Sequence, residues 1–119
     1  MNRQFILTQE FERQWKHMGL DDENLMRLQQ EILQNPQIGA VMEGTGRLRK
    51  MRYAFPYQGK SGSVRVIYVD FVVHRTVYLL YAYPKNVKDN LTQEEKNSLK
   101  ATVSKLEKTL ERTIGHERI

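Results

Sequence analysis

Apolar residues recur at helical spacing in two segments near the N-terminus. In the first, Phe11, Trp15 and Met18 follow one another at steps of four and three residues, which places them on one face of an α-helix. Thr8 offers a side-chain oxygen to the start of this helix, and Gly19 is a natural residue for its end. The spacing therefore predicts an amphipathic helix between these two residues.

The second segment begins at Asp21 or Asp22, either of which can cap a helix, and it ends at Asn35-Pro36. Its apolar stripe consists of Leu25, Leu28 or Gln29, Ile32 and Leu33. Together the two segments predict a helical hairpin. The apolar stretch at residues 3–7 predicts a short strand before it.

Beyond a glycine-containing loop at residues 39–46 the pattern changes, because β-branched and aromatic residues dominate. They fill residues 47–55, 63–73 and 76–83, with PYQGKSG and HRT as the interruptions. Long apolar stretches with such short breaks predict three antiparallel strands.

A last helix is marked by a capping box, in which Thr92 and Glu95 satisfy each other's backbone amides. Its apolar stripe is Leu99, Val103, Leu106 and Leu110. The order of elements predicts one α+β domain over residues 1–119, with a small antiparallel sheet, an N-terminal αα-hairpin and a C-terminal helix. We expect the helices to cover one face of the sheet and to leave the other face free to bind a ligand.

Composition narrows the classes of function. The 119 residues include no cysteine, which excludes disulfides, iron–sulfur clusters and a thiol nucleophile and suits the cytoplasm. No stretch is apolar for long enough to span a membrane. His17, His74 and His116 show no metal-ligand spacing, and no nucleotide-binding fingerprint is present, so we expect neither a metal ion nor a cofactor.

Charge is concentrated in one part of the chain. The formal net charge is +5, and residues 44–69 contain no Asp or Glu. The cations of this stretch are Arg47, Arg49, Lys50, Arg52, Lys60 and Arg65. A basic stretch of this kind favours a polyanionic partner, either a nucleic acid or an acidic protein.

Arg65 is the most informative of these cations. The two-residue period of a strand places Lys50 and Arg52 on one face with Leu48 and Ala54, and it places Arg49 on the other. Arg65 lies within an apolar strand, where a long charged side chain is seldom found without a partner. It could reach solvent from a sheet edge.

Pairing with Asp70 or Glu43 is a further ordinary explanation of Arg65. The functional interpretation is an anion clamp, because a guanidinium matches two phosphate oxygens and stabilises charge that develops at phosphorus. Lys60, in a glycine-flanked loop, and Lys85, after a strand, are weaker candidates that solvation alone would explain. The interleaved aromatic residues, Tyr83 among them, suit base stacking or simple core packing.

Four ordered motifs, GTGRLRKMRYAF, GKSGSVRVIY, YLLYAYPKN and DNLTQEEK, resemble the RelE/HigB-like toxins of the RelE/ParE superfamily. The resemblance covers roughly residues 40–100 and implies a RelE-like microbial ribonuclease fold. It also implies a type II toxin that enters the ribosomal A site and cleaves messenger RNA without a metal ion. The expected partners are the ribosome, its messenger RNA and an antitoxin, HigA-like with a helix-turn-helix domain.

The resemblance assigns roles to individual residues. It implies that Arg65 stabilises the transition state, with Lys60 near the phosphate and Lys85 as a general acid or a further phosphate contact. For RNA binding the candidates are Lys50, Arg52, Arg49 and Tyr83.

The chain departs from the family pattern at Arg47, Ser63-Val64 and Pro84. Pro84 directly precedes Lys85, and proline fixes its own φ and lacks an amide donor, so the backbone before Lys85 differs from that of the family motif. The alternative function is that of a ParE-like toxin, which inhibits DNA gyrase by binding and cuts nothing.

Overall fold

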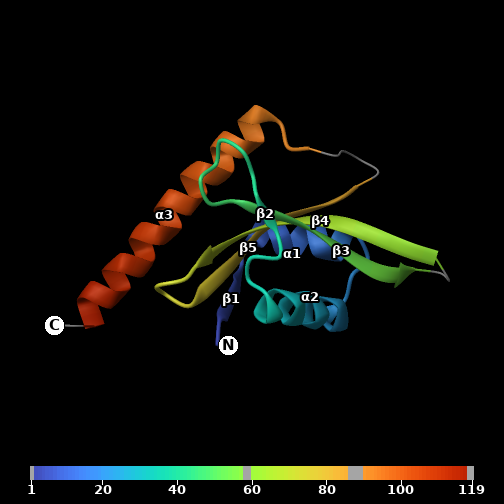
Figure 1. Ribbon diagram of the computed structural model, residues 1–119, viewed down its shortest axis with the longest axis horizontal. Helices are drawn as coiled ribbons and strands as arrows, with labels where there is room; N and C mark the ends of the chain where they lie inside the picture. The colour runs from blue at the N-terminus through green and yellow to red at the C-terminus, as the bar shows by residue number, and fades with distance from the viewer. Residues whose placement is uncertain (1, 58–59, 86–89, 118–119) are drawn as a thin grey trace.

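The computed structural model describes residues 2–57, 60–85 and 90–117 (Figure 1). Its elements are β1 (Gln4–Leu7), α1 (Gln9–His17), α2 (Asp22–Gln34), β2 (Ala40–Val41), β3 (Arg49–Tyr57), β4 (Lys60–Phe71), β5 (Thr76–Pro84) and α3 (Gln93–Glu117). Within these residues no helix is both long and apolar enough to cross a membrane.

The five strands form one sheet in the order β1-β5-β4-β3-β2. β2 to β5 are antiparallel neighbours, and the antiparallel pairing of the last three of them, β3, β4 and β5, was predicted. β1 is parallel to β5, so the prediction of a purely antiparallel sheet is wrong. The parallel pairing is possible because α1, α2 and three strands separate β1 from β5 in the chain, which is ample for a crossover.

Side chains start each helix as the sequence predicts. The Thr8 hydroxyl oxygen accepts a hydrogen bond from the Phe11 amide at 3.1 Å and donates one to the Leu80 carbonyl at 2.9 Å. Asp21, rather than Asp22, caps α2 by accepting from the Asn24 amide at 2.8 Å. The Thr8 bonds therefore fix both the start of α1 and its position against β5.

The capping box of α3 is also confirmed. The Glu95 carboxylate accepts from the Thr92 amide at 2.9 Å, and the Thr92 hydroxyl accepts from the Glu95 amide at 3.1 Å. The helix continues to Glu117, well past the apolar stripe that predicted it.

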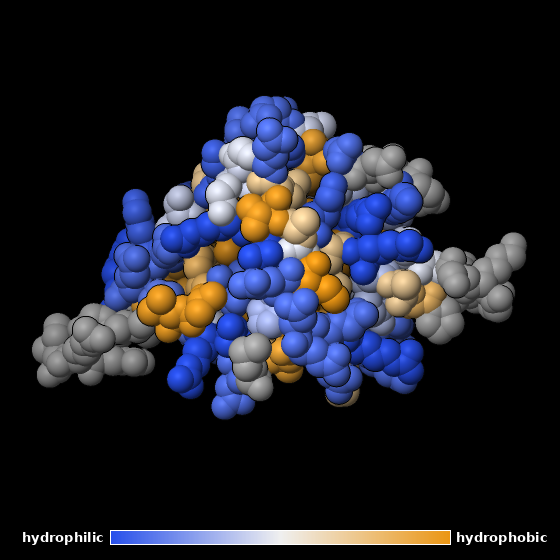
Figure 2. Space-filling model, viewed as in Figure 1, coloured by the Kyte–Doolittle hydropathy of each residue, from blue (hydrophilic) through white to orange (hydrophobic). Residues whose placement is uncertain are grey.

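The strands differ from prediction mainly at their ends. β3 and β4 extend into the segment predicted as a loop, where Tyr57 pairs with Lys60. β2 lies in the predicted loop at residues 39–46 and was missed because two residues are too few to show a period. The turn between β4 and β5 carries Val72 and Val73, exposed to 64% and 87%. Figure 2 shows an apolar patch at the left, where this turn lies in Figure 1.

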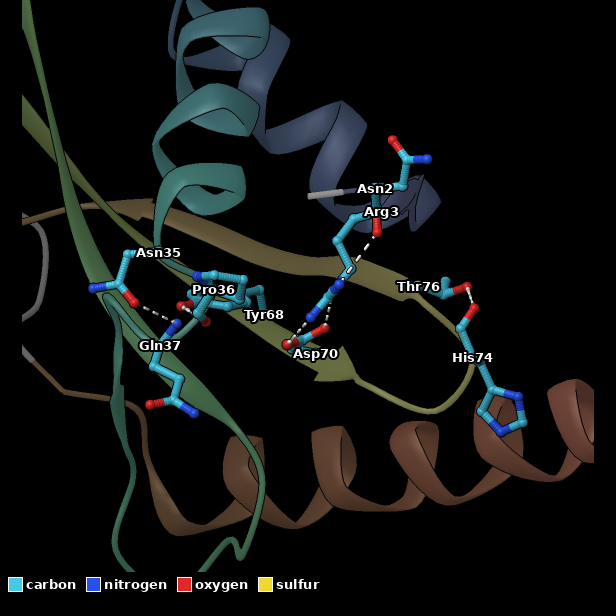
Figure 3. A network of polar contacts seen from close by, with 9 residues as sticks. All are labelled: Asn2, Arg3, Asn35, Pro36, Gln37, Tyr68, Asp70, His74 and Thr76. Atoms are coloured by element: carbon cyan, nitrogen blue, oxygen red, sulfur yellow. Dashed lines mark hydrogen bonds and ion pairs between the residues drawn. The ribbon is translucent and has the colours of Figure 1, made fainter.

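Helices cover both faces of the sheet, and the expectation of helices on one face only is wrong. On one face, Phe11 and Trp15 of α1 and Leu28 and Ile32 of α2 pack against β3, β4 and β5. On the other face, Val103 of α3 belongs to a separate apolar cluster. Figure 3 shows α2 and α3 on opposite sides of the strands. The stripe of α3 needs apolar cover, and the first face is already filled by the helical hairpin.

Candidate active site

Arg52, Arg65 and Tyr83 lie directly opposite one another on three adjacent strands. Arg65 of β4 pairs with Arg52 of β3 on one side and with Tyr83 of β5 on the other. Opposite residues of an antiparallel pair point to the same face, so these three side chains form one row across the sheet. We call them the cationic row.

The cationic row is on the face that α3 covers, and the predicted two-residue period is confirmed there. Leu48 packs in the α3 cluster, whereas Met51 and Tyr53 pack against α1 and α2. Lys50 is two residues before Arg52 and therefore shares its face. Its ammonium donates to the Asn90 side-chain oxygen at 3.1 Å.

The surroundings of Arg65 contradict both of its ordinary explanations. β4 is the middle strand of the five, so Arg65 is not at a sheet edge. Asp70, an odd number of residues away on the same strand, points to the other face and binds Arg3, with Arg3 Nε to Asp70 Oδ1 at 2.9 Å (Figure 3). Glu43, the other suggested partner, makes no ion pair within the described residues.

Arg65 lacks a partner within the part of the chain that the structure describes. Its Nε atom is buried and makes no hydrogen bond there. No carboxylate within the described residues forms an ion pair with Arg52 or Arg65. Like charges directly opposite each other destabilise a sheet, and an unpaired buried polar atom costs about 1–3 kcal/mol. The arrangement therefore lowers stability, and it leaves two adjacent cations able to bind an anion.

The two lysines with predicted catalytic roles are placed differently. Lys85 directly follows β5 and is exposed, and the pairing of Pro84 with Val64 holds it at the same end of the strand as Tyr83. Lys60 is the first residue of β4, and its side chain lies outside the described part of the chain. At about 3.3 Å per residue, its backbone is roughly 16 Å from Arg65 along the strand.

Arg49 is not brought to the row either. It is on the face of α1 and α2, where its Nη1 donates to the Gly39 carbonyl at 2.7 Å. The Tyr68 hydroxyl accepts from the Gly39 amide at 2.9 Å and donates to the Pro36 carbonyl at 2.8 Å. A Cβ on Gly39 would be only 2.8 Å from the Tyr68 ring. Arg49 and Tyr68 thus anchor the chain between α2 and β2.

Tyr83 is only 4% exposed, which leaves little of its ring for base stacking. Its ring centroid is 5.9 Å from that of Tyr81, and the Tyr81 hydroxyl donates to the Glu95 carboxylate at 3.1 Å. Tyr81, Glu95 and Asn90 therefore link the start of α3 to the strands that bear the row. Sequence reasoning missed these three roles, although Asn90 and Glu95 both lie in the motif DNLTQEEK.

Within the described residues, no group of three or more His, Asp or Glu side chains is placed to hold a metal ion. Cations, rather than metal ligands, thus characterise this face.

A family model described as the RelE toxin of the RelE/RelB toxin–antitoxin system matches residues 3–116. This match covers most of the chain, and the protein therefore belongs to the RelE toxin family. It is the toxin component of a toxin–antitoxin system, and the family implies a cognate antitoxin as its partner.

Among solved structures, a mutant of the E. coli toxin RelE in the free state is similar, with a TM-score of 0.51 and 15% sequence identity. The alignment covers 75% of this chain and 90% of that one. At this identity the likeness bears on the fold alone, and it agrees with the α+β prediction.

Proposed function

We propose that this toxin is an endoribonuclease that cleaves messenger RNA on the ribosome, with Arg65 as the residue that stabilises the transition state. The observation that carries the proposal is Arg65, opposite Arg52 and without a partner among the residues that the structure describes. Two guanidiniums on one face, without carboxylates paired to them in the described part of the chain, form a site for a phosphate. Family membership supports a toxic activity, and this geometry supports RNA as its target.

The reaction is an attack by a ribose 2′-hydroxyl on the adjacent phosphorus. The bond from the 2′-oxygen to phosphorus forms, and the bond from phosphorus to the 5′-oxygen of the next nucleotide breaks. One proton leaves the 2′-hydroxyl and another reaches the departing 5′-oxygen. Negative charge builds on the other phosphate oxygens in the transition state, where fixed cations lower its energy. The proposed reaction is metal-independent, because the row itself provides the positive charge.

The other cations are assigned roles in cleavage by their positions relative to the cationic row. Arg52 binds the same phosphate from β3, and Lys50, two residues away, binds the neighbouring part of the RNA backbone. Lys85, exposed at the end of β5, is the candidate for protonating the leaving oxygen. For Lys60 the sequence-based proposal of a phosphate contact is retained as a prediction.

The cationic row contains no side chain that is an efficient base, and this favours dependence on the ribosome. Amine and guanidinium side chains remain protonated near neutral pH in water, so the row supplies charge rather than an efficient base. The ribosome would lower the rest of the activation barrier by holding the RNA in line for attack, and positioning of this kind is worth several kcal/mol. Such a toxin works in the cytoplasm, and its antitoxin is proposed to be HigA-like, with a helix-turn-helix domain.

The test is a cleavage reaction with purified ribosomes and a defined message, in which the 5′ ends of the products are mapped. Wild-type toxin is compared with Arg65→Ala, and Arg27→Ala serves as a control because that arginine is exposed on α2 and pairs with Glu23. We expect cuts with the wild type and the control only when ribosomes are present. Strong cleavage of free RNA would contradict ribosome dependence.

An intact message together with arrested growth would contradict the nuclease proposal itself. It would favour the ParE-like alternative, in which the toxin inhibits DNA gyrase by binding. Neutral replacement of Arg65 and Lys85 should leave a toxin of that kind active.

A further inference from the structure

The outer edge of β5 is only partly covered by β1. The parallel pairing ends where Leu7 meets Leu79, and the chain then enters α1. Beyond this point a groove of about 570 Å³ lies between α1 and the rest of β5, a size typical of small-molecule sites. Its lining includes Arg13, His17, Met18, Tyr81, Tyr83 and Pro84.

The groove is closed to an added β-strand. The outward amide of Ala82 already donates to the side-chain oxygen of Gln14 at 2.7 Å. The next amide position on that edge is Pro84, which has no N–H. A strand would find no donors here, so an occupant must bind through aromatic, apolar and ionic contacts.

Arg13 provides a cation at the mouth of the groove. Its side chain is 71% exposed and pairs with Glu10, whose side chain is 45% exposed. Exposed ion pairs of this kind contribute little to stability, so the guanidinium can exchange its carboxylate for a phosphate at small cost. His17, one helical turn further on, lines the same groove.

The groove adjoins the cationic row at Tyr83. Tyr83 lines the groove and is also the cross-strand neighbour of Arg65. Adjacent strands are about 4.8 Å apart, so the groove begins within one residue pair of the proposed cleavage site. An apolar and aromatic surface beside a cation matches the base and the phosphate of one nucleotide.

We propose that this groove binds a nucleotide adjoining the cleaved bond, with its phosphate at Arg13 and its base between α1 and Tyr81. The proposal rests on the nuclease function proposed above. It adds a second contact region, on α1 and the edge of β5, that the basic stretch of sequence at residues 44–69 does not include.

The test uses ribosome-bound message and three proteins: wild type, Arg13→Gln and the matched control Arg27→Gln, another exposed helical arginine with a carboxylate partner. We expect the toxin concentration for half-maximal cleavage to rise about three- to fivefold for Arg13→Gln, the range of one exposed ionic contact. The cut position and the maximal rate should not change. Arg27→Gln should match the wild type.

A second series identifies the partner of Arg13. Single phosphates within two nucleotides of the cut are replaced by neutral methylphosphonate. At one position the replacement should weaken wild-type binding about as much as Arg13→Gln does, and it should have no further effect on that variant. This pattern would place the phosphate at Arg13.

Three results would overturn the proposal, and they are distinguishable. If the wild type does not cut, the nuclease function fails and the groove proposal fails with it. If the wild type cuts and Arg13→Gln equals it, only the groove proposal fails. If the effects of Arg13→Gln and methylphosphonate multiply at every position, Arg13 contacts something other than the message, and the groove proposal again fails alone.

Discussion

The two faces of the sheet differ in the hydrogen bonds and ion pairs that their polar side chains make. On the face of α1 and α2, Tyr68 makes two hydrogen bonds, Arg49 binds a carbonyl and Asp70 binds Arg3. On the α3 face, Arg65 has no hydrogen bond to its buried Nε within the described residues, and Arg52 is directly opposite. Folding explains the first set of contacts. The second set lacks such contacts within the described residues, which is why we propose a function for it.

The strongest test of this comparison is to replace one arginine on each face. Arg65→Met should lower ribosome-dependent cleavage about 10²–10³-fold, the usual effect of losing one transition-state donor. It should leave the melting temperature unchanged or higher, because it removes a repulsion and orphans no partner. Arg49→Met should leave cleavage nearly unchanged. It should lower the free energy of unfolding by about 1–2 kcal/mol, because the Gly39 carbonyl loses its donor.

Cleavage rates and thermal melts of the two variants provide the measurement. A loss of cleavage in Arg49→Met as large as that in Arg65→Met would show that Arg49 belongs to the RNA site after all. A marked fall in the melting temperature of Arg65→Met would show that Arg65 is structural.

The ion pair between Arg3 and Asp70 tests how much the first face depends on its partners. Both side chains are nearly buried, at 10% and 7% exposure. Asp70→Ala should cost about 2–3 kcal/mol, because a charged hydrogen-bonded pair is lost in a partly buried setting. Glu23→Ala, which removes an exposed pair with Arg27, should cost less than about 1 kcal/mol. Urea denaturation measures both, and equal costs would contradict the ranking.

Tyr68 gives the same face a pH dependence. Burial raises its pKa above the ordinary 10.0, against smaller opposing effects of the Gly39 amide and Arg49. Above pH 10 the unfolded chain therefore loses the proton while the native protein keeps it, and stability falls as pH rises through the native pKa. Burial also raises the pKa of Tyr53 and Tyr78.

We therefore expect the free energy of unfolding to decline from about pH 10 upward. Tyr68→Phe should be less stable near neutral pH by about 1–3 kcal/mol, because the Pro36 carbonyl and the Gly39 amide lose their partner. Its decline above pH 10 should be shallower. Urea denaturation between pH 7 and 11 measures both effects, and parallel curves would exclude Tyr68 as a source of the slope.

The smallest expected difference is between two helix caps. Thr92→Ala removes a cap from α3 and should cost about 1 kcal/mol. Thr8→Ala removes a cap from α1 and also the bond to the Leu80 carbonyl, so it should cost more. Urea denaturation of the two variants measures both losses in the free energy of unfolding. A larger loss for Thr92→Ala would show that the start of α3 contributes more to stability than the start of α1.

Local signals in the sequence predicted what local physics controls. Thr8, Asp21 and the Thr92–Glu95 box cap their helices as expected, because a cap needs only residues three positions apart. The faces of Leu48, Met51 and Tyr53 were also correct, because alternation is built into an extended chain. The four motifs were enough to indicate the family that the family model then matched over residues 3–116.

Contacts between distant residues could not be predicted in this way. The parallel pairing of β1 with β5, the place of α3 on the second face and the choice of Arg3 as partner for Asp70 each join segments far apart in the chain. The sequence by itself determined the elements other than β2, the alternation of side chains along β3, and a basic stretch that includes Arg52 and Arg65. Only the tertiary structure set these two arginines side by side, with no carboxylate paired to them among the described residues, because strand register depends on how all the apolar surfaces are buried at once.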